Sequence, residues 1–99
     1  MLNLKKLQKE VYQNKLNQGF NVIDVHKEFN YLYGEVGEAV EAYMKKKDDL
    51  GEELADIVIY VLGLAEILGL ELENELLAKF EKVKKRQYKT EDGVLKRIK

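Results

Sequence analysis

Apolar side chains recur at steps of three or four along most of the chain, which is the spacing of one face of an α-helix. A first helix is predicted over residues 3–17, where the repeating apolar positions are Leu2, Leu4, Leu7, Val11 and Leu16. Asp24 has the side chain of a helix N-cap, and the stripe that follows it predicts a second helix. This second stripe consists of Val25, Phe29, Leu32, Val36, Val40 and Tyr43.

Two further helices are predicted beyond the lysines at 45–47, which suit a helix C-terminus. Asp49 and Glu52 have the spacing of a capping box, and the helix that they start runs to about Leu68, with Gly69 as its stop. A fourth helix begins near Glu71 and ends at about Gln87. It carries apolar residues at Leu72, Leu76, Leu77, Phe80 and Val83.

The C-terminal tail breaks this pattern, since Asp92-Gly93 followed by Val94 and Leu95 is typical of a short hairpin. No linker or internal repeat divides the chain. The prediction is therefore an all-α fold, a four-helix bundle-like single domain over residues 1–99 with a short C-terminal hairpin or tail.

The third helix is apolar on nearly every face from Ile57 to Ala65, so it must be surrounded. Three partner helices can hardly bury all of it, and a homodimer or homotetramer that shares this helix is expected. Gly34 and Gly37 lower the stability of the second helix, which suggests that another helix approaches them closely.

Composition narrows the classes of function. Lys and Arg number 17 against 18 Asp and Glu, and this balance argues against nucleic-acid binding through bulk charge. The chain has no cysteine and a single histidine, His26, so thiolate sites and His-rich zinc sites are excluded. Neither a signal peptide nor an apolar run of about 18 residues is visible, so we expect a cytoplasmic protein with no membrane partner.

Four acidic residues stand at the margin of the predicted core. Glu35 and Glu38 lie beside the apolar stripe of the second helix, and Glu53 and Asp56 are about 60° apart on the third. The short turn between these helices predicts antiparallel neighbours, with Glu38 and Glu53 at comparable depth. Four carboxylates this close repel one another, so they must take up protons, move apart or bind a cation.

An all-oxygen site without His or Cys selects hard divalent ions, so Mg²⁺ is expected, with Mn²⁺ as a substitute. Such an ion keeps open positions for water and phosphate oxygens, which suits attack on a phosphoanhydride. The fourth helix carries Lys79, Lys82 and Arg86 on one face, with Lys89 if the helix continues that far. These cations suit a polyphosphate tail, but they also complement a helix dipole.

The chain resembles a known family in Glu35-Val-Gly-Glu38 and Glu53-Leu-Ala-Asp56, an ExxE and an ExxD on consecutive helices. These motifs and their flanks are similar to those of MazG-type all-α nucleoside triphosphate pyrophosphohydrolases, and the similarity covers residues 19–93. The flanks read EFNYLYGEVGEAVEA, DLGEELADIVIYVLGLAEILGLELE and KFEKVKKRQY.

The resemblance implies a Mg²⁺-dependent enzyme that converts a nucleoside or deoxynucleoside triphosphate to the monophosphate and pyrophosphate. It implies that Glu35, Glu38, Glu53 and Asp56 are the catalytic metal ligands, and that Lys79 and Arg86 contact phosphates. Many members carry Asn where this chain has Val83, so a substrate hydrogen bond from that position is lost. The family also implies an oligomer and a housecleaning role.

Several alternatives stay open from the residues alone. The chain is either this hydrolase or a catalytically inactive helical oligomer that acts as an interaction or regulatory module; release of orthophosphate would indicate a phosphatase.

Glu28 either supports the metal site or pairs with Lys27 or another neighbour at the surface. His26 is expected at the surface or in packing. Asn14, Asn17 and Phe20 are candidates for a base pocket. For the rings of Tyr31, Tyr33, Tyr43 and Tyr60, the core and an interface are expected in preference to a platform for base stacking.

Overall fold

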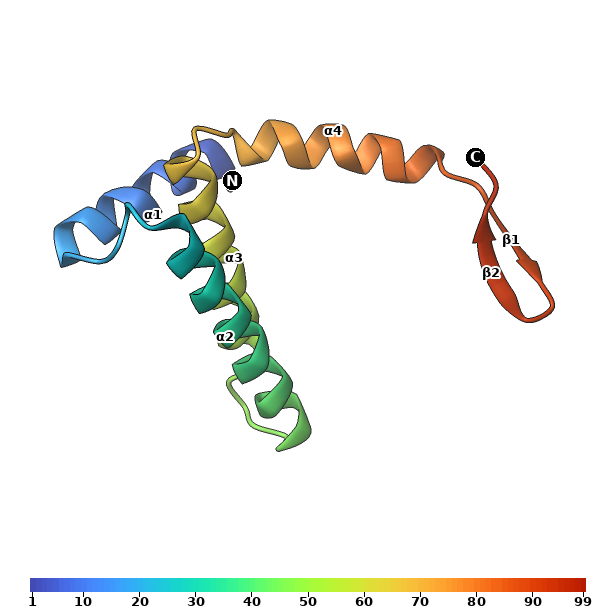
Figure 1. The fold of residues 1–99 in the computed structure, drawn as a ribbon, viewed down its shortest axis with the longest axis horizontal. Helices are drawn as coiled ribbons and strands as arrows, with labels where there is room; N and C mark the ends of the chain where they lie inside the picture. Colours follow the sequence, from blue (N-terminus) through green and yellow to red (C-terminus); the bar gives the residue numbers. More distant parts are fainter.

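The computed structural model describes all 99 residues and contains the four predicted helices followed by the predicted hairpin. The elements are α1 (Leu4–Gln18), α2 (Val25–Met44), α3 (Leu50–Ile67), α4 (Leu72–Lys85), β1 (Tyr88–Glu91) and β2 (Val94–Arg97). Figure 1 shows α1 to α3 grouped at one side, while α4 extends away from them and carries the hairpin at its far end. None of the helices combines the length and the hydropathy that a bilayer crossing requires.

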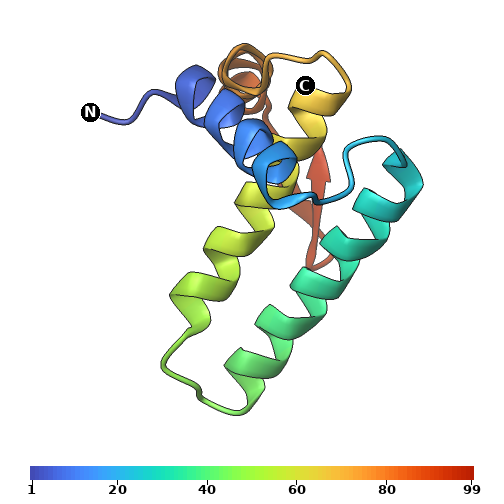
Figure 2. The ribbon, with the colours of Figure 1, turned by 90° about the vertical axis from the view of Figure 1, so that its left-hand side faces the viewer.

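The helices α2 and α3 form an antiparallel pair, and α1 crosses one end of it (Figure 2). Two alanines of α2, Ala39 and Ala42, are buried in the contact with α3, and their small side chains let the two helices approach closely. On α3 the buried stretch is Leu62 to Ala65, below α1. A Cβ on Gly63 would lie 3.3 Å from Cδ of Lys15, so this glycine gives the side chain of α1 its space.

The close approach expected at Gly34 and Gly37 is not made within the chain, because both glycines face open space. Only nine of the 99 residues are buried, which is few for a domain of this size. Much of the apolar surface remains exposed, including Phe80 of α4 at 56% and Val58 of α3 at 51%. The single chain therefore leaves its apolar stripes largely uncovered.

Helix ends follow local capping chemistry at most positions. Asp24 is the predicted N-cap of α2, and its carboxylate accepts a hydrogen bond from the backbone N–H of Lys27 at 3.1 Å. Gly69 ends the α3 region with φ +72°, as expected of a glycine stop. The predicted capping box at Asp49 is wrong: its backbone (φ −93°, ψ 14°) lies outside the extended region that an N-cap needs, and its carboxylate caps nothing.

The fourth helix ends at Lys85, two residues before the predicted end, because the backbone there forms hydrogen bonds with the end of the hairpin. Arg86 is extended (φ −68°, ψ 141°), and the next residue, Gln87, accepts a hydrogen bond from the backbone N–H of Ile98 at 2.8 Å. Lys89 therefore lies on β1 and not on the cationic face of a helix. Asp92 and Gly93 have φ of 52° and 75°, which is the left-handed pair of a tight hairpin turn.

Candidate metal and nucleotide site

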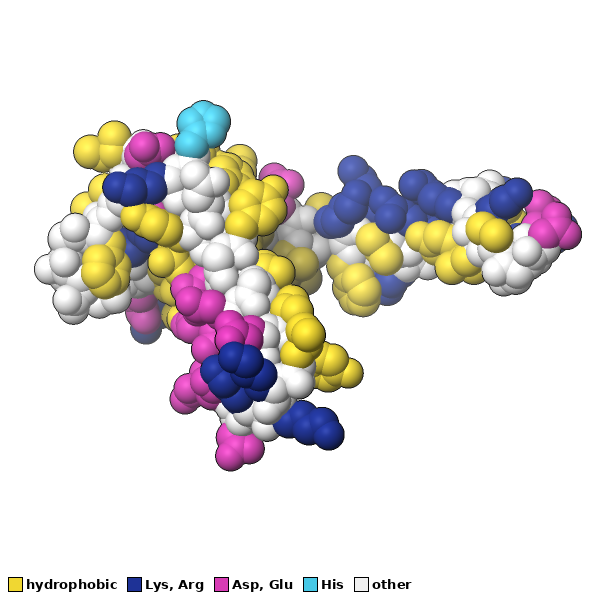
Figure 3. Space-filling model, turned by 60° about the horizontal axis from the view of Figure 1, so that its bottom comes forward, with side chains coloured by type: hydrophobic (Ala, Val, Ile, Leu, Met, Phe, Trp, Pro, Cys, Tyr) yellow, Lys and Arg dark blue, Asp and Glu magenta, His cyan; other side chains and the backbone are white.

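Three carboxylates converge across the helix pair. Glu35 and Glu38 are one turn apart on α2, and Glu53 faces them from α3, with one oxygen of each within 4.8 Å of the others. The antiparallel pairing predicted from the short turn is what brings them together. We call α4 and the hairpin at its end the arm. Figure 3 shows acidic side chains gathered on this part of the helix pair, while the cations of α4 lie on the arm.

Asp56 lies outside this trio but belongs to the same electrostatic cluster. Burial raises the pKa of Glu35, and the charges of Glu38, Asp56 and Glu53 raise it further. Burial likewise raises the pKa of Glu53, followed by the charges of Glu38, Asp49 and Asp56. The predicted repulsion among the four carboxylates is thus present, and the only cation among these causes is Lys47, which acts weakly on Glu53.

Three carboxylate oxygens in this region are buried and have no hydrogen-bond partner: Oε2 of Glu35, Oε2 of Glu53 and Oδ1 of Asp49. An unpartnered buried carboxylate oxygen is costly, and a bound cation removes that cost. Two oxygens on opposite sides of one Mg²⁺ are about 4 Å apart, so the observed spread is close to a ligating arrangement. The donor set, oxygen without nitrogen or sulfur, suits a hard divalent cation.

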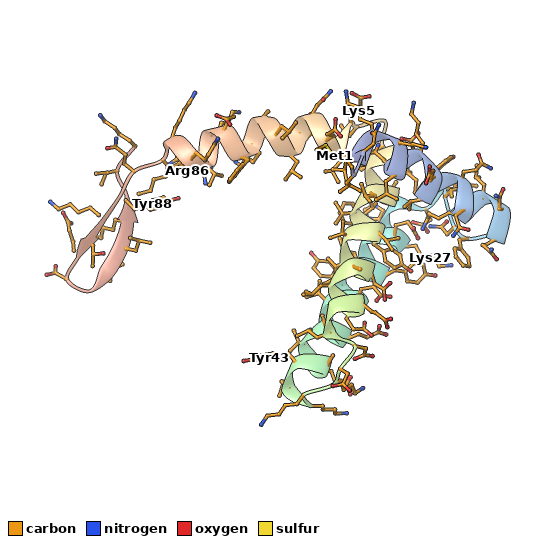
Figure 4. All side chains as sticks on the ribbon, turned by 180° about the vertical axis from the view of Figure 1, so that it is seen from behind. Met1, Lys5, Lys27, Tyr43, Arg86 and Tyr88 are labelled. Atoms are coloured by element: carbon orange, nitrogen blue, oxygen red, sulfur yellow. The ribbon has the colours of Figure 1, made fainter.

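The cations predicted for the phosphates lie elsewhere in the chain. Lys82 and Arg86 line a hollow at the far end of α4, whereas Lys79 lies on the same helix outside that hollow. The helix α4 packs on α1 and makes no comparable contact with α2 or α3. Figure 4 shows Arg86 at the junction of α4 and the hairpin, well away from the helix pair. The structure therefore does not join these cations to the carboxylates of the same chain.

A second hollow, of about 510 Å³, lies at the end of the helix pair that α1 crosses, and its wall residue Tyr31 precedes Glu35 by one helical turn on α2. We call it the aromatic hollow; it is lined by Lys15, Gly19, Phe20, Asn21, Lys27, Glu28, Tyr31 and Tyr60. The rings of Tyr31 and Tyr60 are 6.2 Å apart across α2 and α3. Burial raises the pKa of Tyr60, and the charges of Glu35 and Glu28 raise it further.

Of the base-pocket candidates, Phe20 lines this hollow, and Asn14 lines a smaller adjacent one with Ile59 and Tyr60. Asn17 lines neither hollow. The assignment of Tyr31 and Tyr60 to core and interface is incomplete, since both rings form walls of the aromatic hollow. His26 is exposed in the first turn of α2, as expected.

The wall of the aromatic hollow contains a buried ion pair that the sequence reasoning missed. Glu28 is 2% exposed and pairs with Lys15, so a surface partnership with Lys27 is wrong. Its second oxygen accepts a hydrogen bond from Nδ2 of Asn21 at 3.1 Å, and the Lys15 ammonium lies 5.1 Å from the centre of the Tyr60 ring. A signal was available: Lys15 stands four residues after Val11 on the apolar stripe of α1.

Comparisons with known proteins agree with this geometry. A family model of the MazG nucleotide pyrophosphohydrolase domain matches residues 16–90. Among solved structures, the chain is similar to a cyanophage S-2L MazG-like pyrophosphohydrolase, described as bound to dGDP and three catalytic Mn²⁺ ions per active site. The identity is 24%, the TM-score is 0.69, and the match covers 100% of each chain, which shows a shared fold. No curated protein sequence matches the chain.

Proposed function

Since the chain belongs to the MazG nucleotide pyrophosphohydrolase family, we propose that it cleaves the α–β phosphoanhydride of a nucleoside or deoxynucleoside triphosphate, releasing monophosphate and pyrophosphate. The observation that carries this proposal is the convergence of Glu35, Glu38 and Glu53 within 4.8 Å, with buried oxygens left unpartnered. Asp56 adds its charge to the cluster and is included as a fourth ligand.

Mg²⁺ is the cation proposed for this site, with Mn²⁺ as a substitute; the structural relative is described with Mn²⁺. Such a cation supplies a bound water of lowered pKa and polarises the phosphate that the water attacks. The protein's part is to hold the carboxylates in place on two rigid helices and to orient the water through Glu35 or Glu38. In the metal-free protein, burial and the neighbouring carboxylates raise the pKa of Glu35.

The aromatic hollow is the proposed seat of the nucleoside. Its wall residue Tyr31 lies one helical turn before Glu35 on α2, its aromatic side chains offer faces for stacking, and its volume of about 510 Å³ falls within the range of small-molecule pockets. The pair of Lys15 and Glu28 fixes the loop between α1 and α2, because Asn21 of that loop binds both Glu28 and the backbone oxygen of Asp24. Base preference would then depend on this loop.

Cations for the phosphate tail are proposed to come from a second copy of the chain. The arm extends away from the carboxylates of its own chain and carries the cations Lys79, Lys82 and Arg86. Its apolar side chains Leu76 and Phe80 are exposed. Docking the arm on a partner would cover these residues together with Val58 of α3, which is also exposed. A homodimer or homotetramer would thereby complete each site.

The proposal is tested by incubating a panel of nucleoside and deoxynucleoside triphosphates with the protein and Mg²⁺ and identifying the products. Monophosphate and pyrophosphate are expected, whereas orthophosphate would indicate a phosphatase. Glu38→Gln and Asp56→Asn should each abolish turnover, while Glu10→Gln, which changes an exposed carboxylate of α1, should not. No turnover of any nucleotide and no calorimetric Mg²⁺ binding would favour the inactive interaction module instead.

A further inference from the structure

The buried ion pair of Lys15 and Glu28 forms part of the wall of the aromatic hollow. In the proposed function this pair only fixes the loop between α1 and α2. A buried ion pair is a weak source of stability, because the desolvation of both charges offsets their attraction, and an apolar pair of similar size often does as well. The presence of two charges beside a hollow is therefore better explained by what the hollow binds.

The ammonium of Lys15 has N–H groups that the chain leaves unused. One of its three N–H groups donates to Oε1 of Glu28, and the ammonium makes no other hydrogen bond. Its other close neighbour is the ring of Tyr60, whose centre lies 5.1 Å away and which presents no strong acceptor on its face. Because buried donors without acceptors are costly, a ligand that brings an acceptor into the hollow gains from this ammonium.

The acceptors in the same wall are shielded or already occupied. The side chain of Glu28 is 2% exposed, against 10% for Lys15, and its second oxygen accepts from Asn21. The side-chain oxygen of Asn21 in turn accepts from the backbone N–H of Asp24 at 3.1 Å. Lys27, the remaining charged residue of the wall, has donors only. The charged and amide groups of the hollow therefore offer donors to a ligand and no free acceptor.

This excess of donors distinguishes nucleobases by the edge that each one presents. Guanine, hypoxanthine, uracil and thymine have a carbonyl oxygen at the position where adenine and cytosine have an amino group. A carbonyl oxygen accepts a charge-assisted hydrogen bond from an ammonium, whereas an amino group places its own donors against the ammonium. We propose that Lys15 is a specificity-determining residue, which favours nucleotides with an oxo base over those with the corresponding amino base.

The surroundings of Lys15 hold its ammonium in one place. A Cβ on Gly63 would lie 3.3 Å from Cδ of Lys15 and 3.7 Å from Cγ1 of Val11, so the stem of the lysine passes through a narrow space between α1 and α3. Glu28 binds the end of the side chain. A donor fixed at both its stem and its end cannot turn away from an unsuitable base, as a surface lysine can. The inference rests on the proposed function for the position of the nucleoside, but not on the metal.

The test compares triphosphates of equal size whose bases differ at this edge. With Mg²⁺, kcat/KM should be higher by about tenfold or more for dITP than for dATP, and likewise for dUTP than for dCTP. Combining Lys15→Met with Glu28→Leu leaves no buried charge unpaired, and both ratios should then fall to within about twofold of equality. Glu28→Gln keeps the ammonium and an acceptor for it, so the preference should persist in this variant.

An exposed ion pair of the same helix provides the matched control. Combining Lys6→Met with Glu10→Leu removes that pair outside the hollow and should change neither ratio by more than about twofold. Circular dichroism checks that the variants stay helical. Equal ratios in the unaltered protein and in the Lys15 and Glu28 double variant would overturn the inference. A preference lost equally in Glu28→Gln would overturn it as well, because the ammonium is still present there.

Binding measurements separate this inference from the proposed function. The α,β-methylene analogues of dITP and dATP cannot be hydrolysed between these two phosphates, so calorimetry measures their affinity whether or not the protein is active. The dITP analogue should bind about tenfold more tightly, and the difference should disappear in the Lys15 and Glu28 double variant. That result in a protein that hydrolyses no triphosphate would uphold the role of Lys15 and refute the proposed function. Hydrolysis of all four triphosphates with equal efficiency would do the reverse.

Discussion

The side chain of Gln8 accepts a hydrogen bond from the backbone N–H of Leu72 at 3.1 Å, and this contact ties the first residue of α4 to α1. The same amide donates through Nε2 to the backbone oxygen of Leu70 at 2.7 Å and to Oε1 of Glu66 at 2.9 Å. The side chain of Gln8 itself is 3% exposed, so the amide makes these contacts in place of contacts with water. Because α4 packs mainly on α1, this amide fixes the direction of α4 together with the backbone N–H of Leu4, which donates to Oε1 of Glu73 at 3.1 Å.

Replacing Gln8 should therefore cost stability. Gln8→Ala leaves the half-buried backbone groups of Leu70 and Leu72 without their partner, and we expect the free energy of unfolding to fall by about 2 kcal/mol. Gln13→Ala is the matched control, since Gln13 is an exposed glutamine of the same helix that bonds only Asn17. It should change stability by less than about 0.5 kcal/mol. Urea unfolding at fixed protein concentration measures both, and equal losses would contradict this role of Gln8.

Much of the fold could be predicted because helix-forming patterns are local. The apolar stripes and the N-cap of Asp24 gave the start of α2 at Val25, and Asp92-Gly93 gave the hairpin. The end of α4 was misplaced because strand pairing with residues ten or more positions away competes there with the helix. The arm itself was not predicted, since the direction of a helix depends on a tertiary contact such as that of Gln8.

The carboxylates of the candidate site could be predicted for a related reason. A short turn makes neighbouring helices antiparallel, so depth from the turn is enough to place Glu38 opposite Glu53. Lys15 and Glu28 could not be paired this way, because they meet across two elements joined by an irregular loop. Arg97 belongs to a strand that the sequence predicts only as part of a short hairpin, so the pattern carries no information on its place beside Arg86.

The buried pair of Lys15 and Glu28 should be more sensitive to a single replacement than to a double one. Glu28→Ala leaves the Lys15 ammonium buried without its carboxylate, and we expect a loss of about 3 kcal/mol in the free energy of unfolding. Combining Lys15→Met with Glu28→Leu should recover much of that loss, because no uncompensated charge then remains. Thermal or urea unfolding gives the free energy of unfolding of the unaltered protein, of Glu28→Ala and of the double variant.

An exposed ion pair on the same helix provides the control for this cycle. Glu10→Ala removes the exposed carboxylate beside Lys6 and should cost less than about 1 kcal/mol. If the Glu28 and Glu10 variants lost equal stability, the buried pair would contribute no more than a surface pair. A double variant less stable than Glu28→Ala would also contradict the expected desolvation cost.

The pKa shifts of Glu35 and Glu53 predict how the metal-free protein responds to pH. Both are raised in the folded state, by burial and then by neighbouring carboxylates, so the folded protein binds more protons than the unfolded chain above pH 4.5. The free energy of unfolding should therefore fall as the pH rises from about 4.5 through the raised pKa values. Mg²⁺ should restore the lost stability, because it compensates the ionised carboxylates.

Unfolding curves with EDTA and with Mg²⁺ across this pH range test that sign. Replacing Glu35 and Glu53 together by Gln should flatten the metal-free profile and remove the Mg²⁺ effect. Glu41→Gln is a suitable control, since the pKa of Glu41 is lowered by its hydrogen bond to Lys45 and it stands apart from the cluster. Stability that rises with pH in EDTA would show that the carboxylates do not repel one another.

The separation of carboxylates and cations within one chain predicts that two different inactive variants restore each other. Glu38→Gln disables the carboxylate cluster, and Arg86→Ala disables the arm. In a mixed dimer whose arms cross over, one site combines the intact carboxylates of one copy with the intact arm of the other. If subunits mix at random, about a quarter of the activity of the unaltered protein should return.

A mixture of Glu38→Gln with Asp56→Asn is the matched control, because every site then carries a defect on its carboxylate side. Subunit exchange is followed with differently tagged copies, so a lack of mixing is recognised directly. If Glu38→Gln and Arg86→Ala form mixed oligomers with no more activity than the control mixture, the arm does not serve a partner. Recovered activity cannot arise from sites built within single chains, since each chain would still contain its own defect.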